Sequence, residues 1–242
     1  MGLYGHKKEY ELRYSDCDFQ DKLKPSALLA LTQESACRSA DELRFGYEDL
    51  KPINVAFVIV NTYCKFYKDI AFGDALEIET WPLPPRRVFM ERDYCVRANG
   101  ETVAAIASRW CLVDFATFSL RTAEVLGEAH EKCPYRDEKC VEAVWKVPKA
   151  REGKKVCART VMLSECDHYF HANNTRYADY FFDCFTQDEL SRSIDYFQIS
   201  YEKQAKAGAV LEFYREDMQE GVAIEARCGE EVMSRFFVAF KN

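Results

Sequence analysis

Apolar and polar residues alternate through most of the first half of the chain, with one helical interruption. From Lys8 to Tyr14, aromatic and aliphatic residues alternate with charged ones and predict a strand. Pro25 suits the first position of a helix, apolar residues then recur at helical spacing, and Gly46 offers a stop. The sequence therefore predicts a strand followed by a helix.

Three or four long strands are expected after this helix. Gly73-Asp74 supplies one turn between them, and Asn99-Gly100 is a strong hairpin signal. The strand candidates cover residues 55–67, 75–81, 89–97 and 101–115.

The second half of the chain repeats this plan. A strand candidate over residues 156–163 leads to a helix from about 174 to 185, and further strand candidates follow at 194–203, 210–215, 222–227 and 231–240. Ser15-Asp16-Cys17-Asp18 before the first helix is similar to Ser164-Glu165-Cys166-Asp167 before the second, and two more local matches follow in the same order. The pattern indicates a tandem duplication.

The alternation breaks between the halves, from about residue 118 to 155, where prolines and charges are dense. We expect a first domain over residues 1–125, a connector over 126–155 and a second domain over 156–242. Apolar residues of this region could pack the connector against a neighbouring surface: Val125, Leu126, Val141, Val144 and Trp145.

The order of elements predicts an α+β fold in which each half wraps an antiparallel sheet around a long helix. A curved sheet has one apolar face, and a helix rich in Ala, Ser and Leu lets that face approach closely. Two such units can pair side by side. The seam between them is a natural place for a long, thin ligand.

Composition narrows the class of protein. The 242 residues are 48% hydrophobic and 30% charged, which is typical of a globular chain with a substantial core. The net charge of −7 opposes nucleic-acid binding. The longest charge-free run, from Pro52 to Cys64, is shorter than the roughly 20 residues of a membrane span, and charged residues near the N-terminus argue against an export signal.

The eleven cysteines do not form a recognisable framework. Their number is odd, no two have CxxC spacing, and several fall within apolar strands, including Cys64, Cys95 and Cys111. Reduced, mostly buried thiols in a cytoplasmic protein are the better interpretation. We expect no zinc site, no other metal site and no cofactor.

Candidate chemistry is concentrated in one segment, from Glu165 to Tyr177. Asn173 or Asn174 could cap the second helix, and backbone N–H groups at such a helix start can face an oxyanion. His171 immediately precedes them and could hydrogen-bond a reacting water or a carbonyl. In the plainer interpretation Asp167 and both Asn residues only cap turns, and His171 is a loop histidine.

The same segment resembles a motif of the acyl-acyl carrier protein thioesterases, in which an Asp precedes an Asn, a His and a Val-Asn-Asn-x-x-Tyr stretch. The resemblance runs from about Tyr10 to Phe240. In the first half, the following stretches look like the bacterial branch of that family: Tyr14-Ser15-Asp16-Cys17-Asp18, Pro25-Ser26-Ala27-Leu28-Leu29, Gln33-Glu34, Phe45-Gly46-Tyr47-Glu48-Asp49-Leu50 and Glu79-Thr80-Trp81-Pro82.

This resemblance implies a double hotdog fold and a thioesterase that releases free fatty acid from acyl carrier protein in fatty acid biosynthesis. The implied partner is a carrier protein with a phosphopantetheine-linked acyl chain, and the implied enzyme is a monomer of two hotdogs or a homodimer. The first domain would take the acyl chain and the second would carry the catalytic residues. The apolar and aromatic residues of the first helix and strands are expected mainly in the core, and some of them could line an acyl tunnel: Leu28, Leu31, Phe57, Ile59 and Trp110.

Carried over by position, Asp167, His171, Asn173, Asn174 and Tyr177 match the family pattern. Two positions depart from it: Tyr169 stands where the family has an Asn, and Gln204 stands where it has a strand carboxylate. An amide can orient a water but cannot take its proton. Glu202, two residues earlier, would share the face of Gln204 on a regular strand.

We therefore expect Asp167 or Glu202 to supply the carboxylate and His171 to orient water or shuttle its proton. Helix N-terminal amides would polarise the thioester carbonyl. Tyr169 could donate to the same oxygen or close the pocket by its bulk. The alternatives are a hotdog module that binds acyl groups or carrier protein without turnover, and a hotdog enzyme of another specificity, such as an acyl-CoA thioesterase or a dehydratase.

Overall fold

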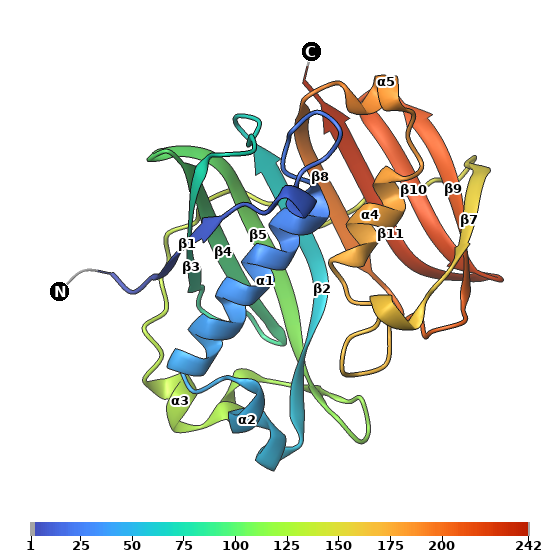
Figure 1. Cartoon of the computed structure of the whole chain (residues 1–242). Coiled ribbons are helices and arrows are strands. Elements are labelled where there is room, and N and C mark those ends of the chain that lie inside the picture. Colours follow the sequence, from blue (N-terminus) through green and yellow to red (C-terminus); the bar gives the residue numbers. More distant parts are fainter. Residues whose placement is uncertain (1–2, 242) are drawn as a thin grey trace.

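The computed structural model describes residues 3–241, and in that range one long antiparallel sheet curls around two helices (Figure 1). The strand order is β1-β3-β4-β5-β2-β8-β11-β10-β9-β7, with β6 paired to β5. The strands are β1 (His6–Glu11), β2 (Val55–Phe66), β3 (Ala75–Pro82), β4 (Phe89–Ala98), β5 (Glu101–Asp114), β6 (Leu120–Arg121), β7 (Lys154–Thr160), β8 (Ile194–Tyr201), β9 (Val210–Met218), β10 (Gly221–Cys228) and β11 (Glu231–Phe240). The predicted fold class is confirmed.

The first half wraps five of these strands around α1 (Pro25–Glu42), which begins at Pro25 as predicted. The face of α1 turned to the sheet carries fully buried small residues such as Ser35 and Ser39, so the helix lies close to the strands. Gly46 does not end this helix. Arg44 adopts a left-handed conformation instead, and Gly46 becomes the N-cap of the short helix α2 (Tyr47–Leu50).

The second half repeats the arrangement around α4 (Arg176–Phe182), which is shorter at both ends than the predicted helix. A short helix α5 (Gln187–Leu190), capped by Thr186, follows. The first strands of both halves also end earlier than predicted, because 3-10 turns η1 (Tyr14–Asp16) and η4 (Leu163–Glu165) follow them.

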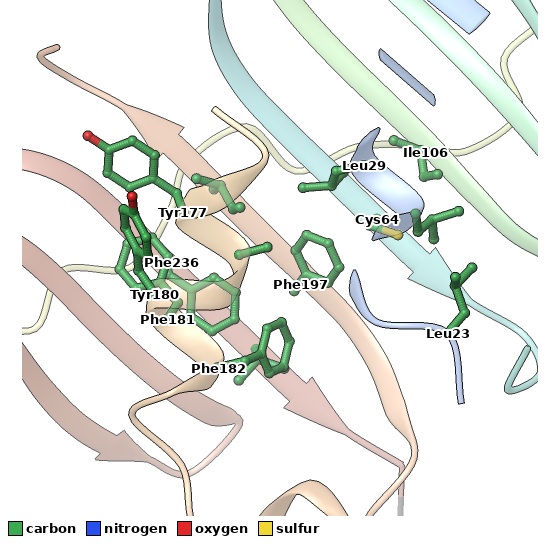
Figure 2. Packing of buried hydrophobic residues seen from close by; sticks show 14 of the residues in the cluster. Leu23, Leu29, Cys64, Ile106, Tyr177, Tyr180, Phe181, Phe182, Phe197 and Phe236 are labelled. Carbon is green, nitrogen blue, oxygen red and sulfur yellow. The ribbon is translucent and has the colours of Figure 1, made fainter. Parts of the chain in front are cut away.

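Strands β2 and β8 join the halves into one sheet. They pair antiparallel from Asn61 opposite Ser200 to Lys65 opposite Tyr196. Figure 2 shows that the buried side chains also continue across this pair: Phe197 of β8 lies between the aromatic residues of α4 and the first-half residues Leu29 and Cys64. The two helices therefore share one hydrophobic core.

The connector crosses the outer face of the sheet after 3-10 turn η3 (Ala123–Leu126) and helix α3 (Glu128–Glu131). The Trp81 indole N–H donates to the carbonyl of Glu138 at 2.9 Å, and the Gln198 amide donates to the carbonyl of Val144 at 2.7 Å. The Val144 side chain itself is 58% exposed, so at this position the backbone makes the contact rather than the expected apolar side chain.

Two negative findings apply to residues 3–241. No helix in this range is both long and apolar enough to span a bilayer. No group of three or more His, Cys, Asp or Glu side chains in the same range is arranged to hold a metal ion.

Candidate active site

The segment between η4 and α4 folds into a tight loop that brings Asp167 and His171 together. The backbone N–H of Phe170 donates to the carbonyl of Asp167 at 3.0 Å, and the N–H of Asp167 donates to the carbonyl of His171 at 3.0 Å. Phe170 takes a left-handed conformation at the tip, with a φ of 62°. His171 Nδ1 consequently lies 3.6 Å from Asp167 Oδ2, which is ion-pair distance and slightly long for a hydrogen bond.

This pair is held in a partly shielded position. The side chains of Asp167 and His171 are only 17% and 19% exposed. The other carboxylate oxygen of Asp167 accepts the backbone N–H of Tyr169 at 2.9 Å, so the carboxylate is fixed by its own loop. Backbone pairing between Ala172 and Ala205, at 2.8 Å, anchors the end of the loop to the segment after β8.

The two asparagines, Asn173 and Asn174, make different contacts. The Asn173 side chain accepts the backbone N–H of Thr175 at 3.0 Å and its hydroxyl at 2.8 Å, and so caps the turn that enters α4. Asn174 instead lines a cavity, while its backbone carbonyl accepts the Tyr201 hydroxyl at 3.2 Å. In this geometry the Asn173 side chain caps a turn, whereas Asn174 contributes to the wall of a cavity.

Tyr169 connects the loop to the first half. Its ring stacks on His171 with 6.1 Å between centroids and an interplanar angle of 16°. Its ring also packs against Tyr47 of α2, with 6.4 Å between ring centroids, and against Phe115, directly after β5, with 5.8 Å between centroids. Burial raises the pKa of Tyr169, so its hydroxyl stays a donor. The contacts of Tyr47 and Phe115 with Tyr169 could not be read from the sequence, because both residues are remote from Tyr169 along the chain.

A narrow cavity lies between α1 and the first-half sheet. Nine of its residues come from the first half, and Asn174 is the one contributed by the second. Of the five possible tunnel residues named above, Ile59 and Trp110 line it, whereas Leu28, Leu31 and Phe57 are not among its lining residues. The full lining is Leu29, Thr32, Gln33, Ile59, Thr62, Tyr94, Ile106, Ser108, Trp110 and Asn174. The cavity thus reaches the second half at Asn174, which follows His171 by three positions in the sequence.

Glu202 and Gln204 come directly after β8, next to the backbone that anchors the catalytic loop through the Ala172–Ala205 hydrogen bond and the His171–Lys206 bridge. β8 ends at Tyr201, so the regular strand on which Glu202 and Gln204 would share a face does not extend to them. Tyr201 points to α4, whereas Glu202 hydrogen-bonds Ser200 and ion-pairs with Arg235 on the opposite face of the sheet. Gln204 is exposed.

Comparisons with known proteins identify the family and the fold. The model of the acyl-ACP thioesterase N-terminal domain matches residues 4–131, which is more than half of the chain. An oleoyl-acyl carrier protein thioesterase 2, chloroplastic, from Arabidopsis thaliana is 20% identical over 227 residues, which cover 86% of this chain and 62% of that protein. The chain therefore spans less than two thirds of the length of this relative.

Two solved structures share the whole fold. An acyl-ACP thioesterase from Bacteroides thetaiotaomicron superposes with a TM-score of 0.91 at 20% identity, covering 98% of each chain. The 12:0-ACP thioesterase from Umbellularia californica gives a TM-score of 0.86 at 19% identity and covers 100% of this chain and 99% of the other. Because the family model matches more than half of this chain, the chain belongs to the acyl-ACP thioesterase family.

Proposed function

We propose that this protein hydrolyses acyl-acyl carrier protein to free fatty acid and carrier protein. The observation that carries the proposal is the shielded Asp167–His171 pair, and Asn174, three residues further along the chain, completes a first-half cavity. The names of the relatives supply the substrate class, an acyl chain on a carrier protein.

Hydrolysis needs a group that takes a proton from water while the water attacks the thioester carbon, and a proton for the departing thiolate. Asp167 is the better candidate for the carboxylate, because Arg235 already neutralises Glu202 on the other face of the sheet. His171 orients the water and passes its proton to the leaving sulfur. The Tyr169 hydroxyl donates to the carbonyl oxygen, and the Gln204 amide can only orient water.

Thiol release from acyl-carrier protein substrates tests this assignment. His171→Ala and Asp167→Asn should each lower kcat by about 100-fold or more, the usual range for loss of general acid or base catalysis. Glu202→Gln decides between the two carboxylates, because it should leave kcat within a few-fold of wild type if Asp167 is the base. Activity that survives both His171→Ala and Asp167→Asn would refute the site.

The alternative without turnover has one specific observation in its favour, the amide at position 204 in place of the family carboxylate. A chain that only binds acyl groups would release no thiol, and Gln204→Glu should then create activity. A working enzyme that relies on Asp167 should change little on the same substitution.

The proposal includes an organisation of the whole chain. We infer that residues 1–125 hold the acyl chain, that 126–155 connect, and that 156–242 supply the catalytic groups. The free state of all eleven cysteines supports a cytoplasmic location. One chain already contains two hotdog units, so a monomer suffices, and a homodimer is the alternative that sedimentation distinguishes.

A further inference from the structure

Two cysteines of the second half lie within reach of each other. Cys157 is on the edge strand β7, and Cys184 comes two residues after α4. Their sulfur atoms are 3.4 Å apart, although the residues are 27 positions apart in sequence. A disulfide has a sulfur–sulfur distance of about 2.0 Å, so small side-chain movements of roughly 1.4 Å would close the bond. Both residues are partly accessible and pack against the core.

The position of this pair relative to the candidate site gives it significance. Cys157 precedes the catalytic loop and Cys184 follows the helix that continues from it, so the two bracket Asp167, His171 and Asn174. The Arg159 guanidinium lies over the ring of Tyr180 and ion-pairs with Glu165, so side chains already join the two flanks of this segment. A covalent bond between Cys157 and Cys184 would fix both of its ends.

We propose that Cys157 and Cys184 are a redox modification site, which closes to an intramolecular disulfide by exchange with a low-molecular-weight disulfide and so constrains the catalytic segment. Cysteine pairs that cycle in this way are the usual form of disulfide in reducing compartments. The modification is independent of the proposed hydrolysis, whereas its effect on rate rests on that function.

The exchange proceeds in two balanced steps. The Cys157 thiolate attacks one sulfur of the small disulfide, which forms a mixed disulfide and releases one small thiol. The Cys184 thiolate then attacks the Cys157 sulfur and releases the second thiol. In sum, the protein loses two hydrogen atoms and the small disulfide becomes two thiols. Burial raises the pKa of the Cys184 thiol, which assigns the first attack to Cys157 and the second, intramolecular attack to Cys184.

The test uses the full chain incubated with glutathione disulfide, freed of small thiols and mapped by non-reducing peptide mass spectrometry. We expect a peptide pair linked through Cys157 and Cys184. We also expect a rise in Tm of about 5 °C or more, because a disulfide constrains the unfolded chain. Dithiothreitol should reverse both changes. Cys157→Ser and Cys184→Ser should abolish them, and Cys37→Ser, at an exposed and unpaired thiol, should not.

Released fatty acid, measured directly, gives the functional readout. Oxidation should change kcat several-fold in wild type and not in Cys184→Ser, because small displacements of catalytic groups have large effects on rate. The proposal is wrong if Cys157 and Cys184 can both still be alkylated after incubation with glutathione disulfide, or if other cysteines become linked instead. It is also wrong if kcat is unchanged in an enzyme that is fully linked through this pair. If the link and the Tm rise occur but neither form hydrolyses substrate, the modification site stands and the proposed function fails.

Discussion

Asp93 is a buried carboxyl group without a nearby cation in ion-pair distance among residues 3–241. It lies on β4 with 2% of its surface exposed, and it accepts the backbone N–H of Cys140 at 2.6 Å. Burial raises the pKa of Asp93 to about 7, although hydrogen bonds from the backbone of Cys140 and Val141 act in the opposite direction. In an unfolded chain an Asp ionises at about 3.9. This single residue therefore couples the attachment of the connector to proton binding.

The sign of the coupling follows from these two pKa values. Between about pH 4 and pH 7 the folded state holds a proton that the unfolded chain has released, so the contribution of Asp93 to the free energy of unfolding falls as the pH rises through this window. Asp93→Asn removes the coupling. The stability of the variant relative to wild type should therefore increase between about pH 5 and about pH 8 in urea denaturation. The exposed control Glu142→Gln should show no such trend, and a pH-independent difference for Asp93→Asn would contradict the coupling.

At the scale of elements, α4 depends on its cap more than a longer helix would. The helix has only seven residues, and Asn173 satisfies the N–H of Thr175 in the turn that enters it. Asn173→Ala should lower the free energy of unfolding by about 1 kcal/mol. Asn174→Ala, its neighbour in the cavity wall, should leave stability nearly unchanged and lower the rate of hydrolysis. Chemical denaturation and thiol release separate the two roles, and equal stability losses would show that Asn174 also supports the helix.

The long, regular elements of this fold were readable from the sequence because each is built from local patterning. The hairpin at Asn99-Gly100 forms as predicted, with both residues at positive φ. The ends of elements were less readable, because they depend on the bonds or backbone conformation of single residues. Asn173 caps a turn ahead of α4, which begins only at Arg176, and the left-handed Arg44 follows the end of α1 before Gly46.

The candidate site was likewise only partly readable from the sequence. Asp167 and His171 meet within one loop, so the motif that contains them could be found in the sequence. The end of β8 at Tyr201 decides which way Glu202 points, and the approach of Tyr47 and Phe115 to Tyr169 depends on the tertiary fold. Local sequence patterns do not contain such relations between remote segments.

At the scale of the molecule, the β2–β8 pair makes the two halves one structural unit. Tyr63 of β2 stacks on Tyr196 of β8 with centroids 5.5 Å apart, and Lys65 Nζ lies 2.6 Å from Asp195 Oδ1. Together with the shared core beneath them, these contacts predict that the halves unfold in one transition. The cavity, which needs residues from both sides of the seam, would then be lost and regained with the whole fold.

The distribution of tryptophans allows this cooperativity to be tested. All three, Trp81, Trp110 and Trp145, precede the second half, so their fluorescence reports on the first half and the connector. Phe213 of β9 is fully buried and meets the second-half rings of Tyr180 and Phe181 edge to face. Phe213→Ala should destabilise the protein by about 3 to 5 kcal/mol. If the halves unfold together, the urea midpoint seen by tryptophan fluorescence must fall as far as the midpoint seen by far-UV circular dichroism. A fluorescence midpoint that stays at the wild-type value, with circular dichroism split into two steps, would show that the continuous sheet does not couple the halves.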